Sequence, residues 1–151
     1  MPLVNLPAVT RLRVFCLVVI LAPVTALAGD AVVDFASPTG NIYCIFRDVE
    51  DVSPSGVHCE IYDFIPSQPD PFDVDCHEPP IDWGAQVDLG STGMAQPVCS
   101  GDPVGEGAME LPYGYTITGE GITCASDTGG VTCTNRDGHG FTLSRSRQVL
   151  F

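Results

Sequence analysis

The chain has 151 residues, 44% of them hydrophobic, and it carries 19 acidic residues against six arginines and no lysine. Its formal net charge of −13 disfavours nucleic acid and anionic membrane surfaces as partners, and it makes cationic proteins and divalent cations electrostatically favourable ones. A solvated acidic surface that maintains solubility explains the same charge without any partner.

Residues 1–28 show the order of segments that is typical of a secretory signal peptide. Two arginines precede the apolar run 14–21, and an Ala-Leu-Ala sequence then supplies small residues before a cleavage site. We therefore predict cleavage between Ala28 and Gly29, export to the periplasm or the medium, and a single mature domain over residues 29–151. The apolar run is too short for a stable membrane span, so no membrane anchor is expected after cleavage.

The cysteines indicate a disulfide framework. Cys16 lies inside the signal segment, and the large residues before it are unlike those of a lipoprotein signal. The other six form an even set, which in a short exported chain predicts three disulfides: Cys44, Cys59, Cys76, Cys99, Cys124 and Cys133. No C-x-x-C pair is present, so disulfides are favoured over a zinc site.

Short runs rich in β-branched and aromatic residues, each bounded by turn residues, predict strands along the whole mature part. The runs are residues 31–35, 41–46, 57–62, 85–89, 95–100, 114–118, 121–125, 131–135, 140–145 and 147–151. No window has the periodicity of an amphipathic helix. The sequence therefore predicts an all-β fold, a small disulfide-bonded antiparallel β-sandwich or barrel.

Residues 40–60 and 120–134 share one layout, in which a glycine-led strand carries a cysteine and a second strand begins with Gly-Val-x-Cys. If each segment is a hairpin, its two cysteines lie on facing strands and point to the same side, because strand side chains alternate. We predict the pairs Cys44–Cys59 and Cys124–Cys133, which leaves Cys76 with Cys99.

Residues 63–84 interrupt the strand pattern with five prolines and several acidic residues, and they predict a long proline-rich acidic loop. Its carboxylates are calcium candidates, because hard cations prefer oxygen ligands: Asp70, Asp73, Asp75, Glu78 and Asp82. The segment lacks the central glycine and terminal glutamate of an EF-hand loop. We therefore predict a solvated charge run with no metal and no cofactor, and keep a calcium-stabilised module as an alternative.

The C-terminal segment offers Asp137, His139, Ser144 and Ser146, which are residue types of a hydrolytic site. Asp-Gly between two strand-like runs is, however, a hairpin turn signal, and no G-x-S-x-G elbow is present. We interpret His139 as a turn residue and predict no catalytic residues. A wall-acting or ester hydrolase that uses His139 remains an alternative.

Two further kinds of site have partial support. The histidines His58, His77 and His139 lack any H-x-x-x-H spacing, so a zinc site would require them to converge in the fold. Aromatic residues beside glycines could form a sugar-stacking face, although aromatic packing over disulfides is the more common use: Trp83, Tyr113 and Tyr115.

Several motifs, taken together and in order, carry a family resemblance. They are SPTGNIYC (37–44), GVHCE (56–60), DWG (82–84), CSGD (99–102), LPYG (111–114), and finally GVTCTN, GHGF and SR. The chain resembles, over roughly residues 34–151, a family of small exported bacterial domains of unknown function. That resemblance implies an exported, cysteine-bonded single domain and carries no activity, substrate or catalytic residue.

These observations favour a non-enzymatic binding or envelope-associated module. The expected partner is a cationic protein or a cell-wall glycan. An alternative is an inhibitor of a cationic hydrolase such as lysozyme, because four arginines against 19 acidic residues give the mature part a net charge of −15.

Overall fold

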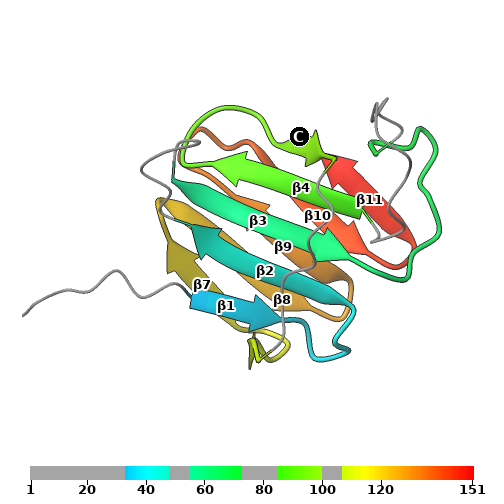
Figure 1. Ribbon diagram of the computed structural model, residues 1–151, viewed down its shortest axis with the longest axis horizontal. Coiled ribbons are helices and arrows are strands. Elements are labelled where there is room, and N and C mark those ends of the chain that lie inside the picture. Colours follow the sequence, from blue (N-terminus) through cyan, green and yellow to red (C-terminus); the bar gives the residue numbers. More distant parts are fainter. Residues whose placement is uncertain (1–32, 48–54, 73–84, 100–106) are drawn as a thin grey trace, which may run out of the picture.

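The computed structural model describes residues 33–47, 55–72, 85–99 and 107–151, so the predicted signal peptide lies outside the described residues. Two sheets pack face to face (Figure 1). Sheet A contains β1 (Val33–Ala36), β2 (Ile42–Arg47), β3 (Gly56–Ile61), β4 (Ala85–Gly90), β5 (Gln96–Val98) and β6 (Met109–Glu110). Sheet B contains β7 (Thr116–Gly119), β8 (Ile122–Asp127), β9 (Gly130–Thr134), β10 (Gly140–Ser144) and β11 (Arg147–Leu150). The prediction of an all-β, disulfide-bonded fold is confirmed.

Both sheets are built from successive hairpins. Sheet A has the order β5-β4-β3-β2-β1-β6, and sheet B has the order β11-β10-β9-β8-β7. All neighbours pair antiparallel except β1 and β6, which pair parallel. The two segments with the same sequence layout form β2–β3 and β8–β9, which are the second and third strands of each five-stranded meander. The sequence echo therefore corresponds to equivalent positions in the two sheets.

The two cystines lie at the centre of the core. Cys44 faces Cys59 across β2–β3, and Cys124 faces Cys133 across β8–β9, and each pair is disulfide-bonded as predicted. The sulfurs of Cys44, Cys59 and Cys133 lie within 4.8 Å of one another, so the cystines of the two sheets are in contact. Cys99 is also disulfide-bonded, whereas its predicted partner Cys76 lies outside the described residues.

The alternation of strand side chains builds the rest of the core. Inward-facing apolar residues of both sheets are fully buried around the cystines, among them Phe35, Ile61, Leu89, Ile122 and Phe141. In a strand with one face toward solvent, every second residue is exposed, but β3 differs: all six of its residues are buried, including His58 and Glu60 on its outer face. The described part of the chain contains no helix that is long and apolar enough to cross a membrane.

The described part of the proline-rich segment runs along β11. Ser67 accepts a hydrogen bond from the Gln148 backbone N–H (2.8 Å), and its own N–H donates to Gln148 Oε1 (2.9 Å). Gln148 is 2% exposed, so this contact pins the segment at a buried point. Asp70, the one calcium candidate among the described residues, accepts the Phe72 N–H; Asp73, Asp75, Glu78 and Asp82 lie outside them.

Candidate functional site

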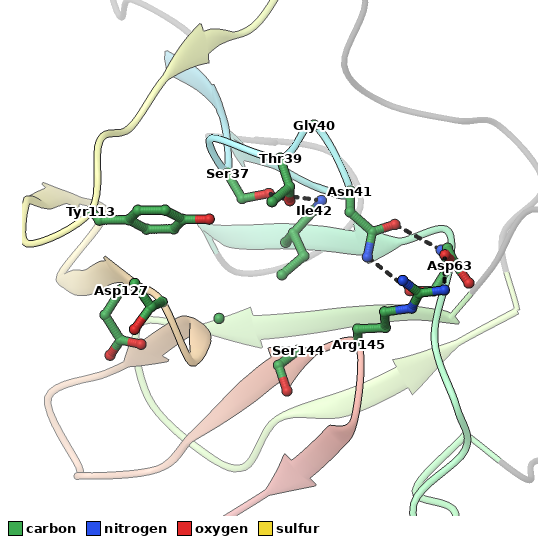
Figure 2. Close-up of a pocket in the computed structure, with 12 residues that line it drawn as sticks. Ser37, Thr39, Gly40, Asn41, Ile42, Asp63, Tyr113, Asp127, Ser144 and Arg145 are labelled. Carbon is green, nitrogen blue, oxygen red and sulfur yellow. Dashed lines mark hydrogen bonds and ion pairs between the residues drawn. The ribbon is translucent and has the colours of Figure 1, made fainter.

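A cleft of about 420 Å³ lies at one end of the sandwich (Figure 2). The β1–β2 turn and the exit of β3 bound it on the side of sheet A, and the β8–β9 and β10–β11 turns bound it on the side of sheet B. Its volume falls in the range of small-ligand sites. Loops that are gathered at the end of a rigid sandwich are a common place for binding sites.

The first wall is the turn Ser37-Pro38-Thr39-Gly40. The Gly40 N–H donates to the Ser37 carbonyl (2.8 Å), which closes a four-residue turn with proline at its second position. Gly40 has a φ of +66°, a conformation that glycine adopts without a side-chain clash. The Ser37 hydroxyl accepts the Ile42 N–H (3.1 Å) and lies 3.2 Å from the Thr39 hydroxyl. The SPTG sequence therefore builds a fixed, hydroxyl-bearing wall.

The second wall links the two sheets through Asp63. The Asn41 side chain donates to the Asp63 carbonyl and accepts the Asp63 N–H, both at 2.8 Å, as a neighbouring strand would. Arg145, from the β10–β11 turn, makes an ion pair with the Asp63 carboxylate at 3.0 Å. Both charged side chains are about two-thirds exposed, so the pair adds little to stability. Its effect is to hold a guanidinium at the rim of the cleft.

Tyr113 and the β8–β9 turn form the third wall. The Tyr115 N–H donates to the Pro112 carbonyl (3.1 Å), and the Gly114 N–H donates to the Ser126 carbonyl (2.7 Å), so the LPYG sequence is a turn docked on β8. Figure 2 shows the Tyr113 hydroxyl directed across the cleft toward the Ser37 turn. Tyr113 is 43% exposed, which leaves its ring accessible to a ligand.

Close backbone packing beneath the β8–β9 turn requires a glycine. Gly130 has a φ of +123°, and a Cβ atom there would lie 2.1 Å from the Leu143 carbonyl oxygen. The Asp127 carboxylate accepts the Gly129 N–H and so shapes the same turn. Because a carboxylate has about four acceptor positions, Asp127 keeps further capacity toward a ligand.

The cleft is therefore a polar site with one aromatic ring. Asn41 and Ser37 are used in holding the walls, whereas Tyr113, Asp127 and Arg145 present a hydroxyl, a carboxylate and a guanidinium at the surface. Such a set suits a ligand that carries several hydroxyl or amide groups and one apolar face.

The structure does not bring the C-terminal candidate residues together. His139 and Asp137 lie in the β9–β10 turn, where the Asn135 side chain accepts both of their backbone N–H groups. Ser144 lines the cleft at the other end of β10 and donates to the Arg147 carbonyl (3.1 Å), and Ser146 lies in the following turn. His139 therefore lies in a turn, and β10 separates it from the cleft.

The other predicted site residues are scattered. His58 lies on the outer face of sheet A, 3% exposed, with its Nδ1 at 2.5 Å from Asp88 Oδ1. His77 and Trp83 lie outside the described residues. Among the described residues, one group of three candidate metal ligands is close enough to hold an ion, and its members are the disulfide-bonded Cys44, Cys59 and Cys133.

A buried acidic group lies beside His58 on the same outer face. The hydroxyl of Tyr62 donates to the Glu60 carboxylate, and Glu60 is fully buried. Burial first, and then the bond to Glu60, raises the pKa of the Tyr62 hydroxyl well above its usual range. This tyrosine therefore stays protonated as a hydrogen-bond donor at all physiological pH values.

Sequence reasoning missed the side-chain amides that organise the two ends of the sandwich. At the end opposite the cleft, Asn135 donates to the carbonyls of Gly90 (3.1 Å) and Gly93 (2.7 Å) and so ties the β4–β5 turn to the β9–β10 turn. Asn41 performs the same kind of task beside the cleft. Asn41 lies in SPTGNIYC and Asn135 lies in GVTCTN, two of the motifs that carry the family resemblance. Their place in these motifs was the sequence signal that could have identified them.

The comparisons with known proteins agree with that resemblance. Residues 14–151 match the model of a family described as "Family of unknown function (DUF6636)". The comparisons with curated proteins and with solved structures found no match. Because the family model covers most of the sequence, the chain belongs to this family of unknown function, DUF6636.

Proposed function

We propose that this protein is a non-enzymatic binding module that recognises a cell-wall glycan in the end cleft. The observation that carries the proposal is the convergence of three motifs on one cleft. The SPTGN turn comes from sheet A, LPYG from the connection between the sheets, and the Ser-Arg pair from sheet B. Ser37 and Asn41 hold the walls in place, whereas Tyr113, Asp127 and Arg145 bring three different functional groups to the same cleft.

The chemistry of the walls suits a glycan. A sugar ring has hydroxyl groups at its rim and an apolar face, and an accessible tyrosine ring offers a matching apolar surface with a polar tip. Asp127 and Arg145 supply an acceptor and donors for the rim hydroxyls. The turn hydrogen bonds of Ser37 and Asn41 fix the walls before binding, so little conformational entropy is lost on association.

The covalent framework supports a location outside the cytoplasm. Two buried cystines and a fifth disulfide-bonded cysteine, Cys99, require an oxidising compartment to form. Combined with the predicted signal peptide over residues 1–28, they favour export to the periplasm or the medium, where a wall glycan is encountered.

Replacement of Tyr113 by alanine is expected to weaken binding to soluble N-acetylglucosamine oligomers about two- to tenfold, because an aromatic contact contributes about 0.5–1.5 kcal/mol. Isothermal titration calorimetry and co-sedimentation with purified peptidoglycan measure the change. Tyr115→Ala is the matched control, since Tyr115 is 63% exposed two residues away and does not line the cleft. Equal binding by wild type and Tyr113→Ala, or no binding to either glycan, contradicts the proposal.

The charge of the protein favours a second candidate, an inhibitor of a cationic hydrolase. A chain with 19 acidic residues and no lysine associates rapidly with a basic enzyme. An inhibitor is expected to suppress lysozyme activity at both low and moderate salt. Loss of inhibition at moderate salt indicates charge attraction alone, because salt screens exposed charges over about 8–10 Å.

A further inference from the structure

The edges of the two sheets are protected unequally. In sheet A, the edge strand β5 is three residues long and contains Pro97, and the other edge strand, β6, has two residues. In sheet B, the β11 edge is covered by Ser67, which accepts the N–H of Gln148. Short length, proline and a covering loop are the usual ways in which proteins block pairing at an exposed edge.

β7 has none of these protections within the described part of the chain. Its four residues, Thr116–Gly119, include no proline and no charge, and among the described strands they pair with β8 alone. Thr116 and Thr118 are exposed. An uncharged edge without proline is a template for an additional strand.

The hydrogen-bond alternation shows which backbone groups of β7 are directed outward. Tyr115 accepts the Ser126 N–H, so at Tyr115 the backbone bonds toward β8. In an antiparallel pair the bonding direction alternates from residue to residue, so Ile117 and Gly119 also bond toward β8. The N–H and C=O groups of Thr116 and Thr118 therefore point away from sheet B.

The core beside this edge is incompletely covered. Met109 in β6 pairs with Phe35 and so shares its inward-facing side of sheet A, yet Met109 is 57% exposed. Tyr115, next to β7, is 63% exposed, and Ile117 is half-buried. Among the described residues, sheet A has six strands and sheet B has five, and sheet B ends at β7. A sixth strand beyond β7 would extend sheet B toward this uncovered apolar side.

We infer that β7 accepts an extended, cationic segment of a partner protein as a sixth strand of sheet B, at a surface separate from the end cleft. The occupant is a segment of alternating apolar and basic residues. Its apolar side chains would lie on the inner face beside Ile117 and Tyr115, and its basic side chains on the outer face beside the two threonines.

The negative charge of the protein favours a basic partner segment over a second copy of the chain as the occupant of this edge. The chain carries a net charge of −13, and the exposed Glu120 directly follows β7, while Arg136 packs over Gly121 and offsets part of that charge. A second copy of the chain would bring like charge to the edge, whereas a basic segment brings the opposite charge.

The test uses two synthetic peptides, one of alternating lysine and valine and one of alternating glutamate and valine, titrated into the full-length protein. Amide hydrogen exchange is followed by NMR. The lysine peptide is expected to protect the Thr116 and Thr118 amides from exchange, and the glutamate peptide is not. No protection of these amides by the lysine peptide at millimolar concentration overturns the inference.

Two substitutions at one position separate strand addition from charge attraction. Thr118→Pro removes the outward N–H and keeps the backbone bonds to β8, and it is expected to weaken lysine-peptide binding about five- to tenfold, the effect of one backbone hydrogen bond. Both this variant and Thr118→Val lose the contact of the Thr118 hydroxyl with Thr123 in β8 (3.2 Å), so the comparison between them isolates the N–H. Thr118→Val keeps the N–H and is expected to bind like wild type. Equal binding of the lysine peptide by wild type, Thr118→Pro and Thr118→Val overturns strand addition. If the Thr116 and Thr118 amides instead become protected as the protein concentration rises, without any peptide, the edge binds a second copy of the chain and the inference is also overturned.

Discussion

Reduction of the disulfides is expected to leave the protein largely unfolded at physiological temperature. Cys44–Cys59 and Cys124–Cys133 close loops with sequence separations of 15 and 9. The chain-entropy estimate for such loops is about 3 kcal/mol each, against a typical domain stability of about 5–15 kcal/mol. Two bonds therefore account for a large fraction of the free energy of unfolding.

Packing increases the effect beyond chain entropy. The sulfurs of Cys44, Cys59 and Cys133 are within 4.8 Å of one another in a fully buried core. Breaking the bonds places four thiols where two compact cystines were, and non-bonded heavy atoms need about 3.5–4.0 Å of separation. The reduced core is thus overpacked as well as unconstrained.

Thermal unfolding followed by circular dichroism, with and without a reductant, measures this change. The variant Cys44→Ala with Cys59→Ala and the variant Cys124→Ala with Cys133→Ala isolate each bond without adding thiols. Each double variant is expected to melt below wild type and to be less affected by reductant. A cooperative melt of the reduced wild-type protein at an unchanged temperature contradicts the expectation.

Replacement of Asn135 by alanine is expected to lower the free energy of unfolding by about 2–4 kcal/mol, because it removes four part-buried hydrogen bonds to backbone groups. Asn135 is 6% exposed and makes four side-chain hydrogen bonds, two as donor to Gly90 and Gly93 and two as acceptor from the turn that holds Asp137 and His139. These bonds connect the sheets at the end opposite the cleft.

Asp137→Ala is the matched control for Asn135→Ala in urea unfolding. It removes one exposed bond, to the Gly93 N–H, from the same turn and is expected to cost well under half as much. Because the cleft is at the other end, folded Asn135→Ala protein is expected to bind glycan like wild type. Equal destabilisation by the two substitutions shows that the amide has no special structural role.

Two of the three predicted disulfide pairs are confirmed, and they were predictable because they depend on local pattern. Hairpin layout and period-two alternation place Cys44 opposite Cys59 and Cys124 opposite Cys133 within short stretches of chain. The Asp-Gly signal likewise predicted that His139 lies in a turn. Each of these inferences needed only neighbouring residues.

Features that depend on long-range packing were not predictable. β6 has two residues and pairs parallel with β1, so no alternation marks it. The predicted strand over 114–118 begins instead at Thr116, because Tyr113 and Gly114 form a turn. The cleft arises only when turns from both sheets meet. Tyr113 and Arg145 were visible as motif residues, but their proximity to Ser37 and Asp63 was not.

The assignment of the cleft is tested by mapping amide chemical shifts of the isotope-labelled protein during titration with N-acetylglucosamine oligomers. We expect saturable shifts that cluster at Thr39, Tyr113, Asp127 and Arg145, with little change at the Asn135 turn. Shifts that gather along β7 or at the Asn135 turn, or no shifts at saturating sugar, would show that the cleft is not the glycan site.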